Sequence, residues 1–316
     1  MEVIRRVALL CFVLSLTLSV GAQNSHWMEG LPDTMKACRV SIPGTHDSGT
    51  SGVRFPMKHY ARTQTMDLSE QWDAGIRFFD LRPKPVDGTI KIYHGSADCH
   101  LTLEDALLTL KGKLESNPTE FCIVLINMAG GGQEGTDMVM KKIAWLIPED
   151  MITPLENNMT VSDLRGRIFF MSRNFPTHVS DTHGALVRGW PPNRTSTYAQ
   201  LWTGAAGARL WVQDYYTSGK NNADAYLSSK WDNMYHLIRK YQDSDEYEDV
   251  LWCINHASGY TGTGIRTNIK RCSDYINSRL LDYLGTNNGP IGIIPMDFPS
   301  QDLIDAIIFL NTFATE

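Results

Sequence analysis

The 316-residue sequence contains no CxxC pair and no cluster of cysteine and histidine with the spacing of metal ligands. A structural zinc site therefore has no basis in this sequence. The chain also lacks internal repeats, low-complexity tracts and any long linker rich in Gly, Pro or Ser. These absences exclude the repeat, disordered and collagen-like classes, and they favour one globular domain.

Long apolar runs are also absent, with one exception at the amino terminus. Two arginines precede an apolar run from Val7 to Leu18, and small residues follow up to Ala22. This order predicts a secretory signal peptide of residues 1–22, which leaves a single catalytic domain of residues 23–316. The alternative is a membrane anchor, but a span needs roughly 20 apolar residues and this run is shorter. We expect a secreted, extracellular protein with no transmembrane segment in the mature chain.

The sequence has little positive charge. Without the signal peptide it carries 27 basic and 34 acidic residues, a net charge of −7. Proteins that bind nucleic acid need a basic face, so this balance argues against a nucleic-acid partner. Two sequons, which begin at Asn158 and Asn193, agree with an exported glycoprotein.

Short apolar, β-branched or aromatic runs alternate with stretches of helical period along the rest of the chain. Residues 102–116 begin with Thr102 as a helix N-cap and place five apolar residues on one face. The alternation predicts βαβ units and a parallel sheet, in either a doubly wound α/β fold or a (β/α) barrel. The predicted strands are residues 38–42, 76–81, 90–93, 122–126, 168–171, 209–212, 250–254 and 291–296, and the further helices are residues 135–147, 222–241, 265–284 and 300–311.

Ionisable residues follow the carboxyl ends of these apolar runs. In a parallel barrel that end is the face on which active sites form, so residues as distant as His46 and Asp297 would converge on one mouth. A doubly wound sheet would gather only those residues near its switch point. The even distribution therefore predicts a single, distorted TIM-type (β/α) barrel. The residues concerned are His46, Asp47, Asp80, Arg82, His94, Arg173, Asp214, His256 and Asp297.

Two histidines, two arginines and several carboxylates form the candidate site. Two histidines of near-neutral pKa suit a reaction that needs one base and one acid. Arginine supplies a permanently charged fork that matches phosphate oxygens. The carboxylates are too sparse to form a divalent-metal site. The set therefore predicts metal-free cleavage of a phosphodiester in which a neighbouring hydroxyl of the substrate is the nucleophile.

The motifs around these residues are distinctive. They include WMEGLPDTMKACRVSIPGTHDSGT, TQTMDLSEQWDAGIRFFDLRP and IKIYHGSADCHLTLEDALLTLKGKLESNPTEF, followed by GRIFFMSR, WVQDYY and IGIIPMDF. Together they resemble the X domain of phosphatidylinositol-specific phospholipase C in its secreted, bacterial-like form, over nearly the whole mature chain. The resemblance implies cleavage of phosphatidylinositol-type lipids by the inositol 2-hydroxyl, giving diacylglycerol and inositol 1,2-cyclic phosphate.

The resemblance also implies roles for five residues. His46 in GTHDS matches the general base that takes the proton of the inositol 2-hydroxyl, and Asp297 in PMDF matches the carboxylate that orients it. His94 in IYHG matches the general acid that protonates the diacylglycerol oxygen, and Asp47 matches its associated carboxylate. Arg82 in FDLRP matches the arginine that neutralises the phosphate.

Shorter motifs carry the implied substrate-binding residues. Asp80 lies two residues before the phosphate-binding arginine. Arg173 in MSRN, with Asp214 and Tyr216 in QDYY, matches the inositol-binding positions, where the tyrosine ring stacks on the sugar. One position departs from the bacterial pattern: Asn127 follows the run at 122–126, where bacterial members typically present a lysine.

The resemblance further implies that no cofactor is needed. Calcium-dependent relatives carry an asparagine after the first histidine and acidic ligands around the second strand, whereas this chain has Asp47 and Arg82. We therefore expect calcium-independent activity. Three alternatives remain: a catalytically inactive phosphoinositol-binding module, a metal-dependent glycerophosphodiesterase on the same barrel, and a secreted ribonuclease.

The expected partner is phosphatidylinositol or an inositol-anchored lipid, met transiently at a membrane surface. Phe55, Met57 and Tyr60 are candidates for a rim that touches the membrane; the alternative is a loop that packs its own aromatic side chains. Histidines and arginines without a matching motif are expected to be structural, and these are Arg77, His100 and His256.

Overall fold

The computed structural model describes residues 24–175, 184–191, 193, 197–202, 206–218, 222–244 and 251–313. The predicted signal peptide lies outside these residues. Within them, no helix combines the length and the apolar character that crossing a bilayer requires.

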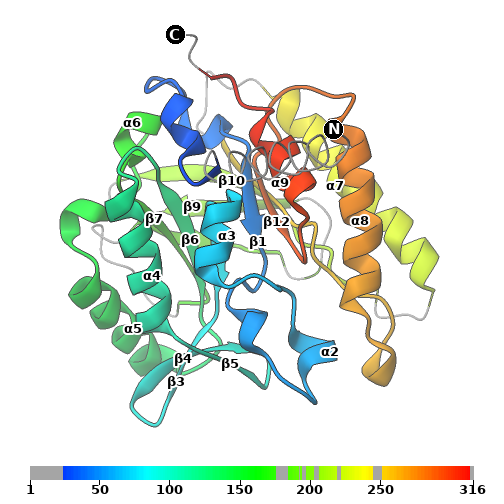
Figure 1. Ribbon diagram of the computed structural model, residues 1–316, viewed down its shortest axis with the longest axis horizontal. Helices are drawn as coiled ribbons and strands as arrows, with labels where there is room; N and C mark the ends of the chain where they lie inside the picture. The colour runs from blue at the N-terminus through cyan, green and yellow to red at the C-terminus, as the bar shows by residue number, and fades with distance from the viewer. Residues whose placement is uncertain are drawn as a thin grey trace, which may run out of the picture.

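The described strands form a closed barrel (Figure 1). All neighbouring pairs are parallel except the two that involve β9, which runs antiparallel to β8 and β10. The expected TIM-type barrel is therefore confirmed, and β9 is its distortion. The barrel strands in spatial order are β1 (Ile42–Thr45), β12 (Ile293–Met296), β11 (Leu251–Asn255), β10 (Gly207–Gln213), β9 (Thr197–Trp202), β8 (Ala185–Arg188), β7 (Ile168–Arg173), β6 (Cys122–Asn127) and β2 (Phe78–Leu81).

Among the barrel strands, the sequence prediction misplaces the start of one and misses two others. The strand expected at residues 38–42 begins later, because Ala37–Arg39 is a 3-10 turn and pairing with β12 starts at Ile42, opposite Ile293. Strands β8 and β9 were not predicted. Their sequences, ALVR and TYAQLW, are short or interrupted by polar residues, so no apolar run marks them.

A separate antiparallel sheet lies between β2 and the following helix. It consists of β3 (Pro83–Val86), β4 (Thr89–His94) and β5 (Ala97–Thr102). Asp87 and Gly88, with φ of 49° and 76°, form the two-residue turn between β3 and β4. The run at residues 90–93 is therefore a hairpin strand and not the barrel strand that we predicted.

Helices surround the barrel, with α4 and α5 on one side and α7 and α8 on the other (Figure 1). The predicted N-cap is confirmed: the Thr102 hydroxyl accepts a hydrogen bond from the Asp105 amide at 3.0 Å. The α-helices are α2 (Lys58–Ala61), α3 (Leu68–Ala74), α4 (Leu103–Ser116), α5 (Gly132–Leu146), α6 (Val161–Leu164), α7 (Ala223–Gln242), α8 (Ile269–Leu284) and α9 (Gln301–Ile308), and the 3-10 turns are Trp27–Gly30, Ala37–Arg39, Thr50–Gly52, Glu149–Met151 and Gly264–Arg266.

The barrel wall is buried on both faces. All six residues of β6 are buried, since one face packs inside the barrel and the other packs under the helices. The polar residues predicted to form the site lie at or just beyond the carboxyl ends of the strands. The fold thus brings them to one mouth, where the connecting loops are free to carry function.

Candidate active site

The predicted base and its carboxylate meet because β1 and β12 are parallel neighbours. Thr45 pairs with Met296, so the next residue of each strand, His46 and Asp297, lie side by side. His46 Nδ1 is 2.8 Å from Asp297 Oδ1. The other oxygen, Asp297 Oδ2, accepts a hydrogen bond from the Gly259 amide at 3.3 Å. The buried carboxylate therefore holds the ring with Nε2 toward the mouth.

Asp47 lies between the two predicted catalytic histidines. Its Oδ2 atom is 3.3 Å from His46 Nε2 and 3.4 Å from His94 Nε2, and its Oδ1 atom is 2.5 Å from Arg82 Nε. Burial alone would raise the pKa of Asp47, but Arg82 and the two histidines lower it. Asp47 is thus an ionised carboxylate shared by three cationic or basic groups.

His94 reaches this carboxylate from the small sheet, at the end of β4. Its Nδ1 atom is 2.7 Å from the carbonyl oxygen of Ala61, the last residue of α2. A carbonyl only accepts, so Nδ1 carries a proton and Nε2 is the atom that faces Asp47. The rings of His94 and His46 lie edge to face, 6.3 Å apart.

The protonation of His46 is set by opposing charges. Burial lowers its pKa, but the carboxylates of Asp47 and Asp297 outweigh burial and raise the pKa to about 9. Arg82 Nη2 lies 2.8 Å from His46 Nε2, a contact that requires a lone pair on Nε2. A pKa near 9 favours the imidazolium, whereas this contact holds the neutral ring. In this geometry the contact with Arg82 determines the protonation state of His46, because the N–H group of the arginine occupies the position that a proton on Nε2 would take.

Asp80 supports the site from behind. It is 1% exposed, and its Oδ2 atom accepts a hydrogen bond from the Asp47 amide at 3.3 Å. The same atom is 3.5 Å from Arg82 Nη2. Its backbone amide donates to the Ser48 hydroxyl at 2.8 Å. The structure therefore places Asp80 beneath the arginine, where it anchors the loop after β1.

Arg173 and Asp214 lie at the ends of β7 and β10, on another side of the mouth. Arg173 Nη1 is 3.9 Å from Asp214 Oδ2. Trp190 joins them, because its indole N–H donates to Asp214 Oδ2 at 2.8 Å and its ring lies 4.2 Å under the Arg173 guanidinium. Burial alone would raise the pKa of Asp214, but His256 and Trp190 contribute to lowering it. No sequence motif marked Trp190.

Tyr216 follows on the same loop as Asp214. Its side chain is 37% exposed, so a ring face is available for stacking on a sugar. The Tyr216 amide donates to Asn193 Oδ1 at 2.9 Å, and the ring is tilted against Tyr260 at 6.1 Å. At the end of β6, Asn127 Oδ1 accepts a hydrogen bond from Asn174 Nδ2 at 2.7 Å.

His256, which we expected to be purely structural, is part of the floor of the site. Its ring lies 5.8 Å from that of His46 and 5.6 Å from that of Trp190. Burial lowers its pKa to about 3, so the ring is neutral at ordinary pH. The sequence feature that could have assigned His256 to the site is its position just after the apolar run at residues 250–254.

Proteins of known name and structure are similar to this chain. The chain is 26% identical to the 1-phosphatidylinositol phosphodiesterase of Listeria monocytogenes, over 97% of this chain and 96% of that one. It is 24% identical to the Staphylococcus aureus (strain Newman) protein of the same name, over 85% and 86%. The solved structure of phosphatidylinositol-specific phospholipase C from Listeria monocytogenes matches with a TM-score of 0.72 and 25% identity, over 92% and 99%. The chain is thus similar over most of its length to bacterial 1-phosphatidylinositol phosphodiesterases.

This similarity confirms the resemblance drawn from the motifs and the type of barrel. No family model matches the chain. The roles of individual residues stay predictions, since they rest on motif and geometry.

One group of described side chains has ligand atoms close enough together for a metal ion: those of His46, Asp47 and Asp80 lie within 4.8 Å of one another. The guanidinium of Arg82 contacts all three residues. A cation there would meet a fixed positive charge at short range, which Coulomb repulsion opposes. The donor set therefore fits an arginine better than a metal ion.

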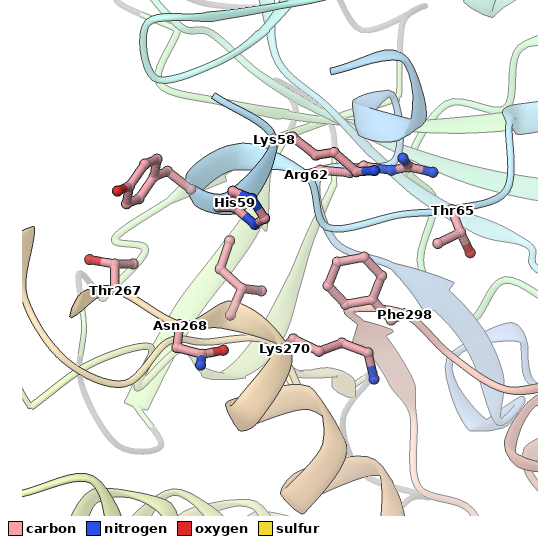
Figure 2. Close-up of a pocket in the computed structure, with 10 residues that line it drawn as sticks. Lys58, His59, Arg62, Thr65, Thr267, Asn268, Lys270 and Phe298 are labelled. Atoms are coloured by element: carbon pink, nitrogen blue, oxygen red, sulfur yellow. The ribbon is translucent and has the colours of Figure 1, made fainter. Parts of the chain in front are cut away.

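A cationic pocket of about 710 Å³ opens beside the mouth (Figure 2). Lys58 and Arg62 line it from the α2 side, and Lys270 lines it from the start of α8. Phe298, the residue after Asp297, lies between them. None of its ten lining residues is acidic. Lys270 forms an ion pair with Asp274, and Lys58 and Arg62 leave the pocket with a positive charge that favours an anionic group.

Proposed function

We propose that the protein is a phosphatidylinositol-specific phospholipase C. It cleaves phosphatidylinositol-type lipids and releases diacylglycerol and inositol 1,2-cyclic phosphate. The observation that carries the proposal is the placement of two histidines on one buried carboxylate, Asp47, with Arg82 in contact with the same group. Homologues of this length and fold are named 1-phosphatidylinositol phosphodiesterase.

The first step forms a bond between the inositol 2-oxygen and phosphorus. Nε2 of His46 takes the 2-hydroxyl proton as the bond forms. Asp297 accepts a hydrogen bond from the Nδ1–H group of the ring and stabilises the imidazolium that forms. Arg82 leaves His46 Nε2 and directs its fork at the non-bridging phosphate oxygens, where negative charge increases in the transition state.

The bond between phosphorus and the diacylglycerol oxygen breaks in the same displacement. His94 donates its Nε2 proton to that leaving oxygen, so diacylglycerol departs as a neutral alcohol. Before the reaction Asp47 stabilises the charged His94 ring, and Ala61 fixes the ring orientation through Nδ1. His46 ends protonated and His94 neutral; exchange of protons with solvent restores both.

The headgroup binds on the opposite side of the mouth. Arg173 and Asp214 supply donors and acceptors for the ring hydroxyls, and Tyr216 supplies a stacking face. Trp190 orients both charged groups. No metal ion or other cofactor takes part, and Arg82 provides the positive charge.

The lipid substrate is reached at a membrane surface. Phe55, which precedes α2, is 85% exposed, and Tyr60, which lines the cationic pocket, is 40% exposed. Exposed aromatic rings and positive charge suit an interface of acyl chains and anionic headgroups. Met57, the third rim candidate, packs against the core instead. We propose that the signal peptide of residues 1–22 exports the domain of residues 23–316, which is secreted and glycosylated.

The test is to incubate the purified protein with phosphatidylinositol in mixed micelles and follow the water-soluble product by phosphorus NMR. A cyclic inositol phosphate is expected, and His46→Ala should not produce it. A folded protein that binds the lipid without any product would instead support the inactive binding module. Glycerophosphoinositol as substrate, with activity only when a divalent metal is added, would support the glycerophosphodiesterase alternative.

A further inference from the structure

Gln213, the last residue of β10, forms a fully satisfied buried hydrogen-bond centre. Its Oε1 atom accepts from Lys230 Nζ at 3.1 Å and from the Tyr215 amide at 2.7 Å. Its Nε2 atom donates to Asn255 Oδ1 and to the His256 carbonyl oxygen, both at 2.9 Å. All four hydrogen-bonding sites of the carboxamide are used, so its orientation is fixed.

Lys230 is the unusual member of this network. It lies on α7 and its side chain is completely buried. In the described part of the chain no carboxylate lies in ion-pair contact with Lys230, and its ammonium group donates a hydrogen bond to Gln213. Burying an ammonium without an opposite charge costs free energy that a methionine of similar length would avoid. This cost in free energy indicates that Lys230 has a role other than stabilising the fold.

Two successive turns of α7 anchor two neighbouring strand ends. Lys230 holds Gln213, and the Met234 carbonyl oxygen, one turn further, accepts from Asn255 Nδ2 at 2.9 Å. Gln213 and Asn255 are the last residues of β10 and β11, and they are paired in register. The next residues are Asp214 and His256. Alternation along a strand directs Gln213 outward to the helix and the following residue inward.

We propose that Lys230 is a positioning residue, which through Gln213 fixes the strand ends that carry Asp214 and His256 and so sets the geometry of the headgroup pocket. It touches neither the reacting atoms nor the base. Its positive charge also helps to lower the pKa of both Asp214 and His256, which keeps the former ionised and the latter neutral. The kinetic part of this proposal rests on the proposed function.

The kinetic test compares Lys230→Met with Lys240→Met, an exposed lysine on the same helix. Lys230→Met is expected to raise KM for phosphatidylinositol about tenfold, the effect of one lost hydrogen bond from a charged group, with kcat within about threefold. Lys240→Met should leave both constants unchanged. Lys230→Gln, which keeps a donor for Gln213, should show a smaller rise in KM than Lys230→Met.

A second readout does not depend on lipid cleavage. The indole N–H of Trp190 donates to Asp214, so its proton–nitrogen NMR signal reports the position of that carboxylate. The signal is assigned by its loss in Trp190→Phe. We expect it to shift in Lys230→Met and to stay in place in Lys240→Met. If the wild-type protein does not cleave phosphatidylinositol, the proposed function fails while this signal still tests the positioning role.

Unchanged KM and an unchanged Trp190 signal in folded Lys230→Met would overturn the proposal. A lower melting temperature with unchanged KM would also overturn it, because that is the result of a purely structural lysine. If Lys230→Met does not fold, Gln213→Glu replaces it. This change keeps the acceptor for Lys230 but removes both donors to β11, so the same shifts in KM and in the Trp190 signal are required.

Discussion

At the amino-terminal end of the barrel, just before β2, Arg77 is completely buried and its guanidinium is saturated with partners. It donates two hydrogen bonds to Glu120 Oε2, at 2.8 and 3.0 Å, and further bonds to four backbone carbonyl oxygens. It also stacks on the Trp72 ring at 3.9 Å. Such a network stabilises one arrangement and leaves nothing for a ligand, although Glu120 Oε1 has no partner.

Arg82, five residues later at the other end of the same strand, has a different environment. Its side chain is 23% exposed, and its contacts with Asp47, Asp80 and His46 do not saturate it. Among the described residues, these buried polar atoms of the mouth have no hydrogen-bond partner: Asp80 Oδ1, Arg173 Nε and His256 Nε2.

Unsatisfied buried groups cost stability, and the atoms named above lie at the face where a barrel places its chemistry. The two arginines that flank β2 thus differ in their surroundings. The first is held in a saturated network, and the second is the one that the proposed mechanism uses to bind the phosphate. The comparison teaches that complete burial and a saturated hydrogen-bond network distinguish the structural arginine from the one proposed to bind substrate.

The largest expected effect is at the mouth. His46→Ala and His94→Ala should each lower kcat on phosphatidylinositol by about 10²- to 10⁴-fold, the range for loss of a general base or acid. Thermal unfolding should change little, since neither ring is part of the core. His236→Ala, on the exposed face of α7, is the control. Near-normal turnover by folded His94→Ala would remove His94 from the mechanism.

The corresponding substitution at the amino-terminal end of the barrel is Arg77→Met. It leaves Glu120 as an unpaired buried carboxylate, so the free energy of unfolding should fall by about 3 to 5 kcal/mol. Urea denaturation measures this loss, and kcat/KM per folded molecule should remain unchanged. Adding Glu120→Gln should restore part of the stability. A catalytic defect in folded Arg77→Met would contradict the purely structural role of Arg77.

The next effect concerns the phosphate charge. Arg82→Lys should lower kcat by about 10²- to 10³-fold, because an ammonium cannot reproduce the bidentate fork. Wild-type activity should survive excess chelator. Loss of activity in chelator, with recovery on adding calcium, would contradict the role of Arg82. An Arg82→Asp variant that gains calcium dependence would show that guanidinium and metal are alternative solutions at this position.

The smallest effect is on stability against pH. Burial lowers the pKa of His256 to about 3 in the folded protein, below its ordinary value of about 6.5. The unfolded chain therefore binds this proton first as the pH falls below 6.5, and the folded state loses up to about 1.4 kcal/mol per pH unit until the folded pKa is reached. His256→Asn should lack this slope. Equal slopes for wild type and variant between pH 7 and 5 would show that His256 titrates normally.

The sequence predicts much of the local structure. The apolar runs, the helical stretches and the Thr102 cap depend on neighbours within a few residues, so they can be recognised from the sequence alone. The same is true of the polar residues at strand ends, which mark a catalytic face whatever the strand order. Charge balance and the motifs around His46, Arg82 and His94 then indicate the chemistry.

Only the tertiary structure decides which of these residues meet. His46 and Asp297 are separated by almost the whole domain, and they touch because barrel closure pairs β1 with β12 in one register. The antiparallel β9, the hairpin that delivers His94, the inward place of His256 and the complete burial of Lys230 likewise follow from long-range packing. Such contacts depend on hydrogen-bond register and closure across the whole chain, and no short-range period of the sequence encodes them.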